Sequence, residues 1–580
     1  MNIFYHYLKK YWKLCILVVI LAAINQIFSL IDPLIFRHVI DDYATKFDSF
    51  TLGQFISGIS FLLILAVGAA FVSRTAKNFQ DYYLNNVTQR LGAKIYNDGI
   101  EHSLALPYAV FEDQRSGETL GILQNVRLTS ETFITSFINV LFVSLIGFAF
   151  VTIYALHIYW GVALVFAITV PTIGTASYVL TNKVKKIQKI ILSETTALAG
   201  STTESLRNIE LVKSLGLVDQ EISRLNTTTD KILKLELKKL RYIRSVSFVQ
   251  GTLINLMRTL ILGFLLYLVF VHTVTFGEFF SLYIYSFFIF GPLQDLGTVI
   301  NNYRDAEVAL GKFTTIMDAP REPVPAKAKT IKKINSLEFR NVSFQYNSAS
   351  KPALDNISFK ASAGETIAFV GPSGAGKTSL VKLLVGLYEP KVGNVLYNNI
   401  TTSDLNLNIL RSQFGFVTQD TQLFAGSIRE NLLFVNPNAT EEECLDALQK
   451  SAANSLLERA DKGINTLIGE GGVKVSGGEK QRLSIARALL RKPTILIFDE
   501  ATSSLDSITE EEITKTIRDV SLGESRITIL IAHRLSTIMH ANRIYVLEKG
   551  ALNEIGTHAE LLEKKGLYYA MWRQQIGERG

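Results

Sequence analysis

The sequence predicts a bundle of membrane-spanning helices followed by an α/β domain built on a mostly parallel sheet. Its 580 residues exceed the length of an ordinary single domain. Long stretches without Asp, Glu, Lys or Arg occur only before residue 310. After it, short apolar runs alternate with helix-like runs, and one of these apolar runs leads into a glycine-rich loop. These observations together indicate two regions of different character.

Composition excludes several classes of protein. Apolar residues make up 48% of the chain and charged residues 19%, which excludes an intrinsically disordered protein. The net charge of +7 is compatible with nucleic-acid binding or with a membrane protein that is basic on its cytoplasmic side. Because the basic residues flank the apolar runs, we favour the membrane protein. Two cysteines, Cys15 and Cys444, do not support a disulfide framework.

Six transmembrane helices are expected, because a helix needs about 20 apolar residues to span a bilayer and satisfies its own backbone there. The third and fourth share one long charge-free stretch and turn near His157, and the fifth is interrupted by Arg258. The stretches that predict them are Leu14–Ile31, Ser49–Ser73, Thr132–Asn182, Ser245–Gly277 and Phe279–Ile300.

Basic residues near the span ends predict the orientation in a cell (inner) membrane. Lysines precede the first span, and clusters of Lys and Arg bound the segment 183–244, so both are expected in the cytoplasm. Six spans then return the C-terminal half to the cytoplasm. Asp32-Pro33 follows the first span where a signal peptide would have a small-residue cleavage site, so we expect an uncleaved N-terminus.

Two long polar segments, 74–131 and 183–244, separate the spans and are expected to be helices that extend beyond the bilayer. Proline-rich Ala319–Pro325 indicates a linker. We therefore expect a transmembrane domain at 1–318, a linker at 319–335 and a nucleotide-binding domain at 336–580.

A phosphate-binding loop is predicted after the apolar strand Thr366–Val370, where the sequence fits G-x-x-x-x-G-K-[ST]. Its glycines let backbone N–H groups turn toward phosphate oxygens, and the following helix adds its positive end. Lys377 can reach the β- and γ-phosphates, and the Thr378 hydroxyl suits Mg²⁺. The residues expected to bind nucleotide here are Gly371, Pro372, Ser373, Gly374, Ala375, Gly376, Lys377, Thr378 and Ser379.

Two more apolar strands end in candidate catalytic residues. Thr494–Phe498 runs into Asp499, a predicted Mg²⁺ ligand, and Glu500, which can orient or deprotonate the attacking water. Ile527–Ala532 ends at His533, which at a strand end can contact the γ-phosphate; a lone histidine is more often structural.

The segment Val475-Ser476-Gly477-Gly478-Glu479-Lys-Gln-Arg resembles the signature of the ABC transporter family. The order of the phosphate-binding loop, this segment and Asp499-Glu500 is similar to that of an ABC ATPase domain, and the spans before it resemble the membrane half of an exporter with long intracellular helices. The segment departs from the family pattern at Val475, in place of Leu, and at Glu479, in place of Gln. The phosphate-contacting Ser476, Gly477 and Gly478 are intact.

The resemblance implies further roles. Tyr346 would stack on adenine, although a strand tyrosine is otherwise most often a packing residue. Gln419 would sense Mg²⁺ in the Q-loop, and the signature residues Ser476 to Glu479 would contact ATP. The resemblance also implies a D-loop ending at Asp506, an X-loop at Gly469–Gly472, a switch role for His533, and coupling regions at Ser116–Glu118 and around Thr203–Lys213.

An ABC-type ATPase that couples hydrolysis of ATP with Mg²⁺ to export of a hydrophobic or amphipathic substrate, such as a drug, lipid or peptide, is the function that the resemblance implies. One phosphate-binding loop and one signature require a second half-transporter, which we expect to be a second copy of the chain. Two alternatives stay open: one half of an obligate heterodimer, and an ATP-gated regulator or channel. Six spans exclude a nucleic-acid-associated ATPase, and fusion of spans to the ATPase makes import the less favoured direction.

Arg258 is a candidate substrate contact, because an ionisable residue inside a span marks function by default. An alternative is that this part of the helix projects into the cytoplasm or that the side chain snorkels there.

Overall fold

A computed structural model describes all residues except 1, 114–115, 294, 326–327, 348, 420, 470–472, 501–506, 523–524, 533 and 578–580. The chain forms two compact units. The membrane unit comprises Met1–Ala105 and Gln114–Ala319, and the nucleotide-binding unit comprises Leu106–Asp113 and Pro320–Gly580.

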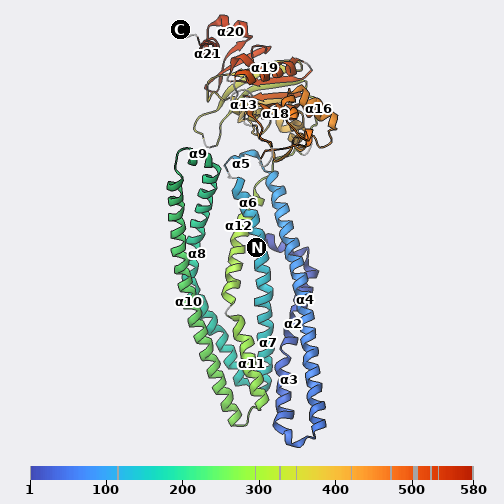
Figure 1. Cartoon of the computed structure of the whole chain (residues 1–580), viewed down its shortest axis with the longest axis vertical. Coiled ribbons are helices and arrows are strands. Elements are labelled where there is room, and N and C mark those ends of the chain that lie inside the picture. The colour runs from blue at the N-terminus through green and yellow to red at the C-terminus, as the bar shows by residue number, and fades with distance from the viewer. Residues whose placement is uncertain are drawn as a thin grey trace. The chain divides into compact units, whose positions relative to one another are not determined.

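The membrane unit is entirely helical in its described residues (Figure 1). Helix α2 packs along α4, α8 along α10, and both α4 and α12 along α6. Its α-helices are α1 (Asn2–Lys9), α2 (Trp12–Ser29), α3 (Asp32–His38), α4 (Leu52–Leu104), α6 (Ser116–Ser136), α7 (Val143–Ile158), α8 (Trp160–Arg207), α9 (Ile209–Ser214), α10 (Val218–Phe270), α11 (Phe276–Leu293) and α12 (Leu296–Asp318).

Most of the predicted spans are long, apolar helices. Five helical segments among the described residues have the length and hydropathy to cross a membrane. The fourth predicted span falls in α8, in which the segment Trp160–Thr169 is apolar but shorter than a full span. The turn expected near His157 is present, because Tyr159 takes an extended conformation between α7 and α8. The predicted membrane fold is confirmed.

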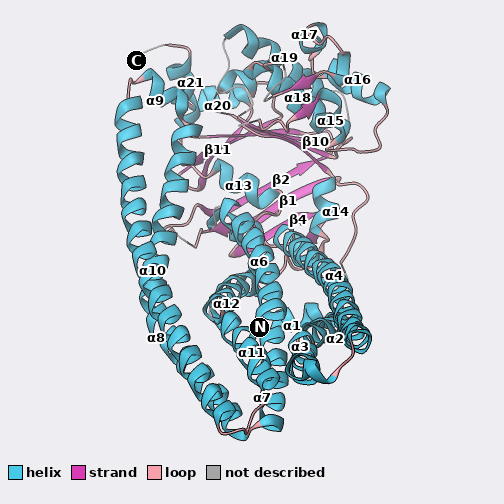
Figure 2. Ribbon diagram, turned by 60° about the horizontal axis from the view of Figure 1, so that its bottom comes forward, coloured by secondary structure: helices cyan, strands magenta, loops and turns pink. Residues whose placement is uncertain are grey.

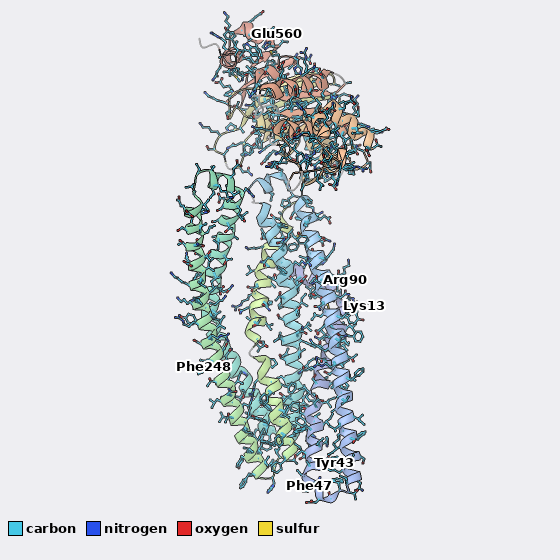
Figure 3. The ribbon with its side chains drawn as sticks, viewed as in Figure 1. Lys13, Tyr43, Phe47, Arg90, Phe248 and Glu560 are labelled. Atoms are coloured by element: carbon cyan, nitrogen blue, oxygen red, sulfur yellow. The ribbon has the colours of Figure 1, made fainter. Side chains whose placement is uncertain are left out.

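The two long polar segments continue the spanning helices, as predicted. Helices α4 and α10 each have 53 residues. At 1.5 Å per residue each is about 80 Å long, more than twice the thickness of a hydrocarbon core. Thr51 starts α4 with a capping box that includes Gln54. Aromatic Phe248 projects from α10 where it is exposed, and Tyr43 and Phe47 lie at the connection between α3 and α4 (Figure 3).

Polar side chains join helices inside this apolar bundle. The hydroxyl groups of Ser29 and Ser73 lie 2.8 Å apart, and Ser73 also donates to the side chain of Asn25 at 3.0 Å. Between α3 and α11, Arg37 donates to Glu278 at 2.6 Å. The Gly277 N–H of α11 donates to Asp41, just after α3, at 2.8 Å. The bonds among Asn25, Ser29 and Ser73 lie within the predicted spans, where such bonds stabilise helix pairs in the absence of water. Arg37, Asp41 and Glu278 lie outside those spans.

The nucleotide-binding unit contains a six-stranded sheet in the order β12-β11-β3-β10-β9-β6 and a four-stranded antiparallel sheet in the order β2-β1-β4-β5 (Figure 2). A short pair, β7-β8, completes the described strands. The strands are β1 (Ser336–Phe344), β2 (Leu354–Ser362), β3 (Thr366–Val370), β4 (Val392–Tyr397), β5 (Ile400–Thr401), β6 (Phe414–Val417), β7 (Gly426–Ser427), β8 (Leu467–Ile468), β9 (Ile495–Asp499), β10 (Ile527–Ile531), β11 (Arg543–Glu548) and β12 (Ala551–Gly556).

Helices cover the six-stranded sheet. Every residue of β3, β9 and β10 is buried, as expected of parallel strands covered on both faces. The predicted α/β fold class is therefore confirmed. The helices of this unit are α5 (Tyr108–Asp113), α13 (Lys377–Leu384), α14 (Leu407–Ser412), α15 (Ile428–Leu433), α16 (Glu441–Lys450), α17 (Asn454–Glu458), α18 (Gly477–Leu490), α19 (Ser507–Leu522), α20 (His558–Lys564) and α21 (Leu567–Gln575).

Helix α5 belongs to the nucleotide-binding unit although it lies in sequence between two helices of the membrane unit. The ring of Tyr108 meets Tyr388 edge-to-face at 5.8 Å, and Lys382 Nζ lies 5.6 Å from the Tyr108 ring centroid. The side chains of the predicted coupling region Ser116–Glu118 lie outside the described residues. The contacts of Tyr108 with Tyr388 and Lys382 lie within the nucleotide-binding unit.

An ion pair fastens the first residues after the membrane unit. Arg411 donates to both carboxylate oxygens of Glu322, at 2.7 and 2.8 Å, and to the carbonyl oxygens of Val385 and Gly386. Because the pair is half-exposed, we assign it about 1 kcal/mol. Glu322→Ala should speed hydrogen exchange of the Ala328 and Lys329 amides, which donate to Pro325 and Asp404 just beyond the pair, roughly fivefold, measured by mass spectrometry on the full-length protein.

Glu338→Ala is the matched control. Glu338 pairs with Arg340 on its own strand, so its loss should leave exchange of the Ala328 and Lys329 amides unchanged. Equal exchange in Glu322→Ala and the unmodified protein would show that the pair does not hold this segment.

Candidate nucleotide-binding site

The predicted site residues gather at one edge of the six-stranded sheet. Strands β3, β10, β9 and β6 are parallel neighbours, with Phe369 paired to Ile531, Ile531 to Asp499 and Phe498 to Val417. Their carboxyl ends therefore lie side by side. The phosphate-binding loop follows β3, Asp499 and Glu500 end β9, and Gln419 lies two residues beyond β6 and is exposed. Ligands of open α/β sheets bind at this edge.

The phosphate-binding loop depends on glycine at two positions. Gly376 has φ of +100°, and a Cβ there would lie 2.5 Å from the carbonyl oxygen of Ala353. Gly374 has φ of +78°, and a Cβ there would meet no atom within 4 Å. The first glycine thus permits close packing, while the second lines open space of the kind that backbone N–H groups use to surround a phosphate.

Lys377 begins α13 and is only 5% exposed. Its ammonium donates to the carbonyl oxygens of Gly371 at 2.9 Å and Pro372 at 3.2 Å, so it spans the loop. Burial lowers the pKa of this ammonium, and the charges of Glu500 and Asp499 oppose that shift. The adjacent Thr378 is exposed at the first turn of α13, where its hydroxyl is open to a ligand. Ala375 and Ser379 are buried beneath the loop.

Two carboxylates stand at the end of β9. Burial, assisted by the charge of Glu500 and opposed by that of Lys377, raises the pKa of Asp499 to about 6. Buried carboxylates of this kind are stabilised by a cation. Glu500 has φ of +51° and donates its backbone N–H to Ile531 at 2.8 Å. A non-glycine residue in this conformation stores strain, which is common at functional sites.

The fit to Mg²⁺ rests on oxygen donors. Among the described residues no group of three His, Cys, Asp or Glu side chains could hold a metal by itself. A magnesium site here would instead combine Asp499, the Thr378 hydroxyl and the Gln419 amide with phosphate oxygens, which is the coordination that Mg²⁺ adopts with nucleotides.

Tyr346 lies beside the first turn of α13. Its hydroxyl group is 3.0 Å from the hydroxyl of Ser379, and its ring meets Phe344 and Tyr388 at about right angles. Lys382 Nζ lies 5.4 Å from the ring centroid. The structure thus brings Tyr346 to the phosphate-binding helix and holds its ring by edge contacts with neighbouring aromatic side chains.

The signature segment caps helix α18. Ser476 accepts from the backbone N–H of Glu479, and the Glu479 carboxylate accepts from the N–H of Ser476 at 2.8 Å. Arg459, at the end of α17, donates to both oxygens of that carboxylate at 2.5 and 2.6 Å. The side chain of Glu479 is 8% exposed and that of Arg459 53%. Arg459 therefore compensates the charge introduced by Glu where the family pattern has Gln.

Some predicted residues lie outside the described part of the chain: His533, Asp506 with the residues 503–505 before it, and 470–472 of the predicted X-loop. Gly477 and Gly478 form the first turn of α18.

Arg459 was missed by sequence reasoning, because it lies 20 positions before Glu479, with no motif or periodicity connecting the two.

A phosphate-binding loop on a parallel sheet, joined to long apolar helices, defines an ATPase fused to a membrane domain. Two family models match the chain, "ABC transporter transmembrane region" at residues 15–293 and "ABC transporter" at 354–503. An ABC transporter ATP-binding protein of Bacillus subtilis, YfiC, is 31% identical over 98% of this chain and 93% of its own length. The chain belongs to the ABC transporter family.

Relatives include a multidrug resistance ABC transporter ATP-binding and permease protein of Lactococcus lactis, 31% identical over 91% of this chain and 88% of that protein. A solved bacterial Atm1-family ABC exporter with ATP bound has a TM-score of 0.85, 27% identity and 98% coverage of both chains. The protein is an ABC-type ATPase coupled to transport, and ATP-driven export is its general activity.

The Glu479–Arg459 pair yields a test. Arg459→Ala leaves a buried carboxylate without its cation, which costs about 1–2 kcal/mol, so we expect ATPase activity of the reconstituted protein to fall roughly tenfold. Glu479→Gln should stay within about twofold of the original activity, because water can solvate the half-exposed Arg459.

Adding Glu479→Gln to Arg459→Ala should restore most of the activity, since no buried charge then remains. Lys450→Ala, which removes an exposed pair with Asp446 on α16, is the control and should have no effect. Full activity of Arg459→Ala would refute this role for the arginine.

Proposed function

We propose that this protein is a homodimeric exporter or flippase of the cell (inner) membrane. It hydrolyses ATP to export a hydrophobic or amphipathic substrate by alternating access. The arrangement of Lys377, Asp499 and Glu500 at the carboxyl edge of the sheet carries this proposal. Both termini are cytoplasmic in it, and the domain limits are 1–318, 319–335 and 336–580. Relatives named for multidrug export and for β-(1→2)glucan export support export and leave the substrate open.

Each residue of the edge has a role in the proposal. The loop from Gly371 to Gly376 surrounds the β-phosphate with N–H groups, and Lys377 leaves its carbonyl partners for the β- and γ-phosphates. Thr378, Gln419 and Asp499 would hold Mg²⁺, which would neutralise charge on the phosphates. Glu500 orients the water and accepts its proton. Tyr346 stacks on adenine, and His533 contacts the γ-phosphate.

The second half of each ATP site comes from another copy of the chain. One chain has one signature, and its Ser476, Gly477 and Gly478 present N–H groups at the start of α18. With Glu479 and Asp506 they would face the phosphate-binding loop of the partner subunit. ATP then bridges two subunits, and loss of the γ-phosphate favours their separation. A closed two-fold dimer satisfies both sites equally.

The surroundings of Arg258 favour a substrate that carries an anionic group. Its guanidinium carbon lies 3.8 Å from the ring centroid of Phe287, which joins α10 to α11. Nε is buried and has no hydrogen-bond partner among the described residues. Arg258 lies 12 residues before the end of α10 at Phe270, or about 18 Å along the helix. A stacked, partly desolvated guanidinium at that depth attracts an anion.

Glu500→Gln tests the catalytic assignment. We expect hydrolysis to fall by about 100-fold or more, because the general base is lost, and ATP-bound closed dimers to accumulate in cross-linking experiments. Transport into proteoliposomes should stop. A conductance that persists or increases with ATP in Glu500→Gln would instead identify an ATP-gated channel, and Glu511→Gln, an exposed neighbour on α19, is the control.

Arg258→Glu tests the substrate assignment. Charge reversal should abolish export of anionic amphipathic molecules while ATPase activity without substrate is kept, because the residue is remote in sequence from the ATPase motifs. Arg258→Lys should retain part of the transport, since the charge remains and the planar stack is lost. Arg244→Glu, exposed on the same helix, is the control. Unchanged transport by Arg258→Glu would remove Arg258 from the pathway.

A further inference from the structure

A basic pocket lies within the nucleotide-binding unit, away from the nucleotide edge. Its volume is about 560 Å³, within the range of pockets that bind small molecules. Four separate stretches of the chain contribute to it. Its lining residues are Lys332, Lys333, Ser412, Gln413, Arg491, Lys492, Pro493, Thr494, Ser525 and Arg526.

The pocket is at the amino-terminal edge of the six-stranded sheet. Gln413, Thr494 and Arg526 immediately precede β6, β9 and β10. The carboxyl ends of those strands carry the nucleotide site, so one strand length, about 16 Å, separates the two. Backbone bonds hold the turns in place: the Thr494 N–H donates to Gln413 at 2.9 Å, and the Ile527 N–H donates to Thr494 at 3.0 Å.

Positive charge dominates the lining. Five of the lining residues are Lys or Arg, and none of the lining residues that the structure describes is acidic. Lys492 is paired with Glu443 at 2.7 Å, whereas Lys332, Lys333 and Arg491 form no ion pair with a described residue. Arg526 is 6% exposed, so a charged group is built into the wall. Bringing like charges together is unfavourable, and a bound anion would offset that repulsion.

Neutral donors add to the cations. The Gln413 side-chain oxygen accepts from the Thr494 hydroxyl at 3.2 Å, which leaves the amide NH₂ group for a ligand. Pro493 is the one apolar residue of the lining. Guanidinium, ammonium and amide donors without an apolar anchor match phosphate oxygens better than they match a peptide, which usually needs an aromatic or aliphatic anchor.

We propose that this pocket binds a small multivalent phosphate, such as a di- or triphosphate group, as a second anion site of the nucleotide-binding unit. Arg491 caps the carboxyl end of α18, whose amino end is the signature. Occupancy would therefore touch the helix that contacts ATP and change ATPase activity. This regulatory consequence rests on the proposed function, whereas binding itself does not.

Binding of inorganic tripolyphosphate to the full-length protein in lipid nanodiscs, measured by calorimetry, tests the site. Lys377→Ala is the background, because it weakens the phosphate-binding loop. We expect salt-dependent binding of one tripolyphosphate per chain to remain in Lys377→Ala. Adding Lys332→Gln and Lys333→Gln should weaken it at least tenfold, since two exposed charge partners are lost without disturbing the core.

Lys564→Gln with Lys565→Gln is the matched control, because these are also adjacent exposed lysines of the same unit. The control pair should leave binding unchanged. Absence of binding at millimolar tripolyphosphate, or equal loss in both pairs, would overturn the proposal. Tighter binding of a poly-glutamate peptide would overturn the phosphate assignment. No readout depends on hydrolysis or transport, so a failure here is distinct from failure of the proposed function.

Discussion

The parallel alignment of β3, β10, β9 and β6 is the constraint on which the rest of the nucleotide-binding unit depends. Their side chains are almost all buried, so the strands are fixed by packing on both faces as well as by the sheet hydrogen bonds. Because they run in one direction, everything that follows them meets at one edge and everything that precedes them meets at the other. The phosphate-binding loop and Asp499 share the first edge, and basic turns share the second.

Buried charges at these edges are arranged in compensating sets. At the nucleotide edge, two carboxylates face the ammonium of Lys377, and burial shifts the pKa of both Asp499 and Lys377 toward the neutral form. At the start of α18, Glu479 is held by its own helix and by Arg459. At the basic pocket, five of the described lining residues are Lys or Arg and none is Asp or Glu. This excess of positive charge distinguishes the pocket from the start of α18, where the charge of Glu479 is compensated by Arg459.

The membrane unit is under a different constraint, because the lipid of a bilayer offers no hydrogen-bond partners to polar groups. Its helices satisfy their own backbones, and isolated polar side chains are placed where they meet another helix. Asn25, Ser29 and Ser73 form one such contact, whereas Arg37, Asp41 and Glu278 form a charged cluster outside the predicted spans. Arg258 differs, because an aromatic ring is its described partner. Its Nε is buried and has no hydrogen-bond partner among the described residues.

Local patterns in the sequence determined the class of the protein. Absence of charge located the spans, the length of one charge-free stretch predicted a turn near His157, and motif order identified the ATPase. In the structure Tyr159 separates α7 from α8 beside that position. These signals are local because hydropathy and backbone conformation depend on nearby residues. Tertiary structure alone decided that Arg459 pairs with Glu479 and that the guanidinium of Arg258 stacks on the ring of Phe287. It also decided that α5 belongs to the nucleotide-binding unit and that four segments form a basic pocket. Such contacts join residues with no fixed spacing, so only the packing of distant segments specifies them.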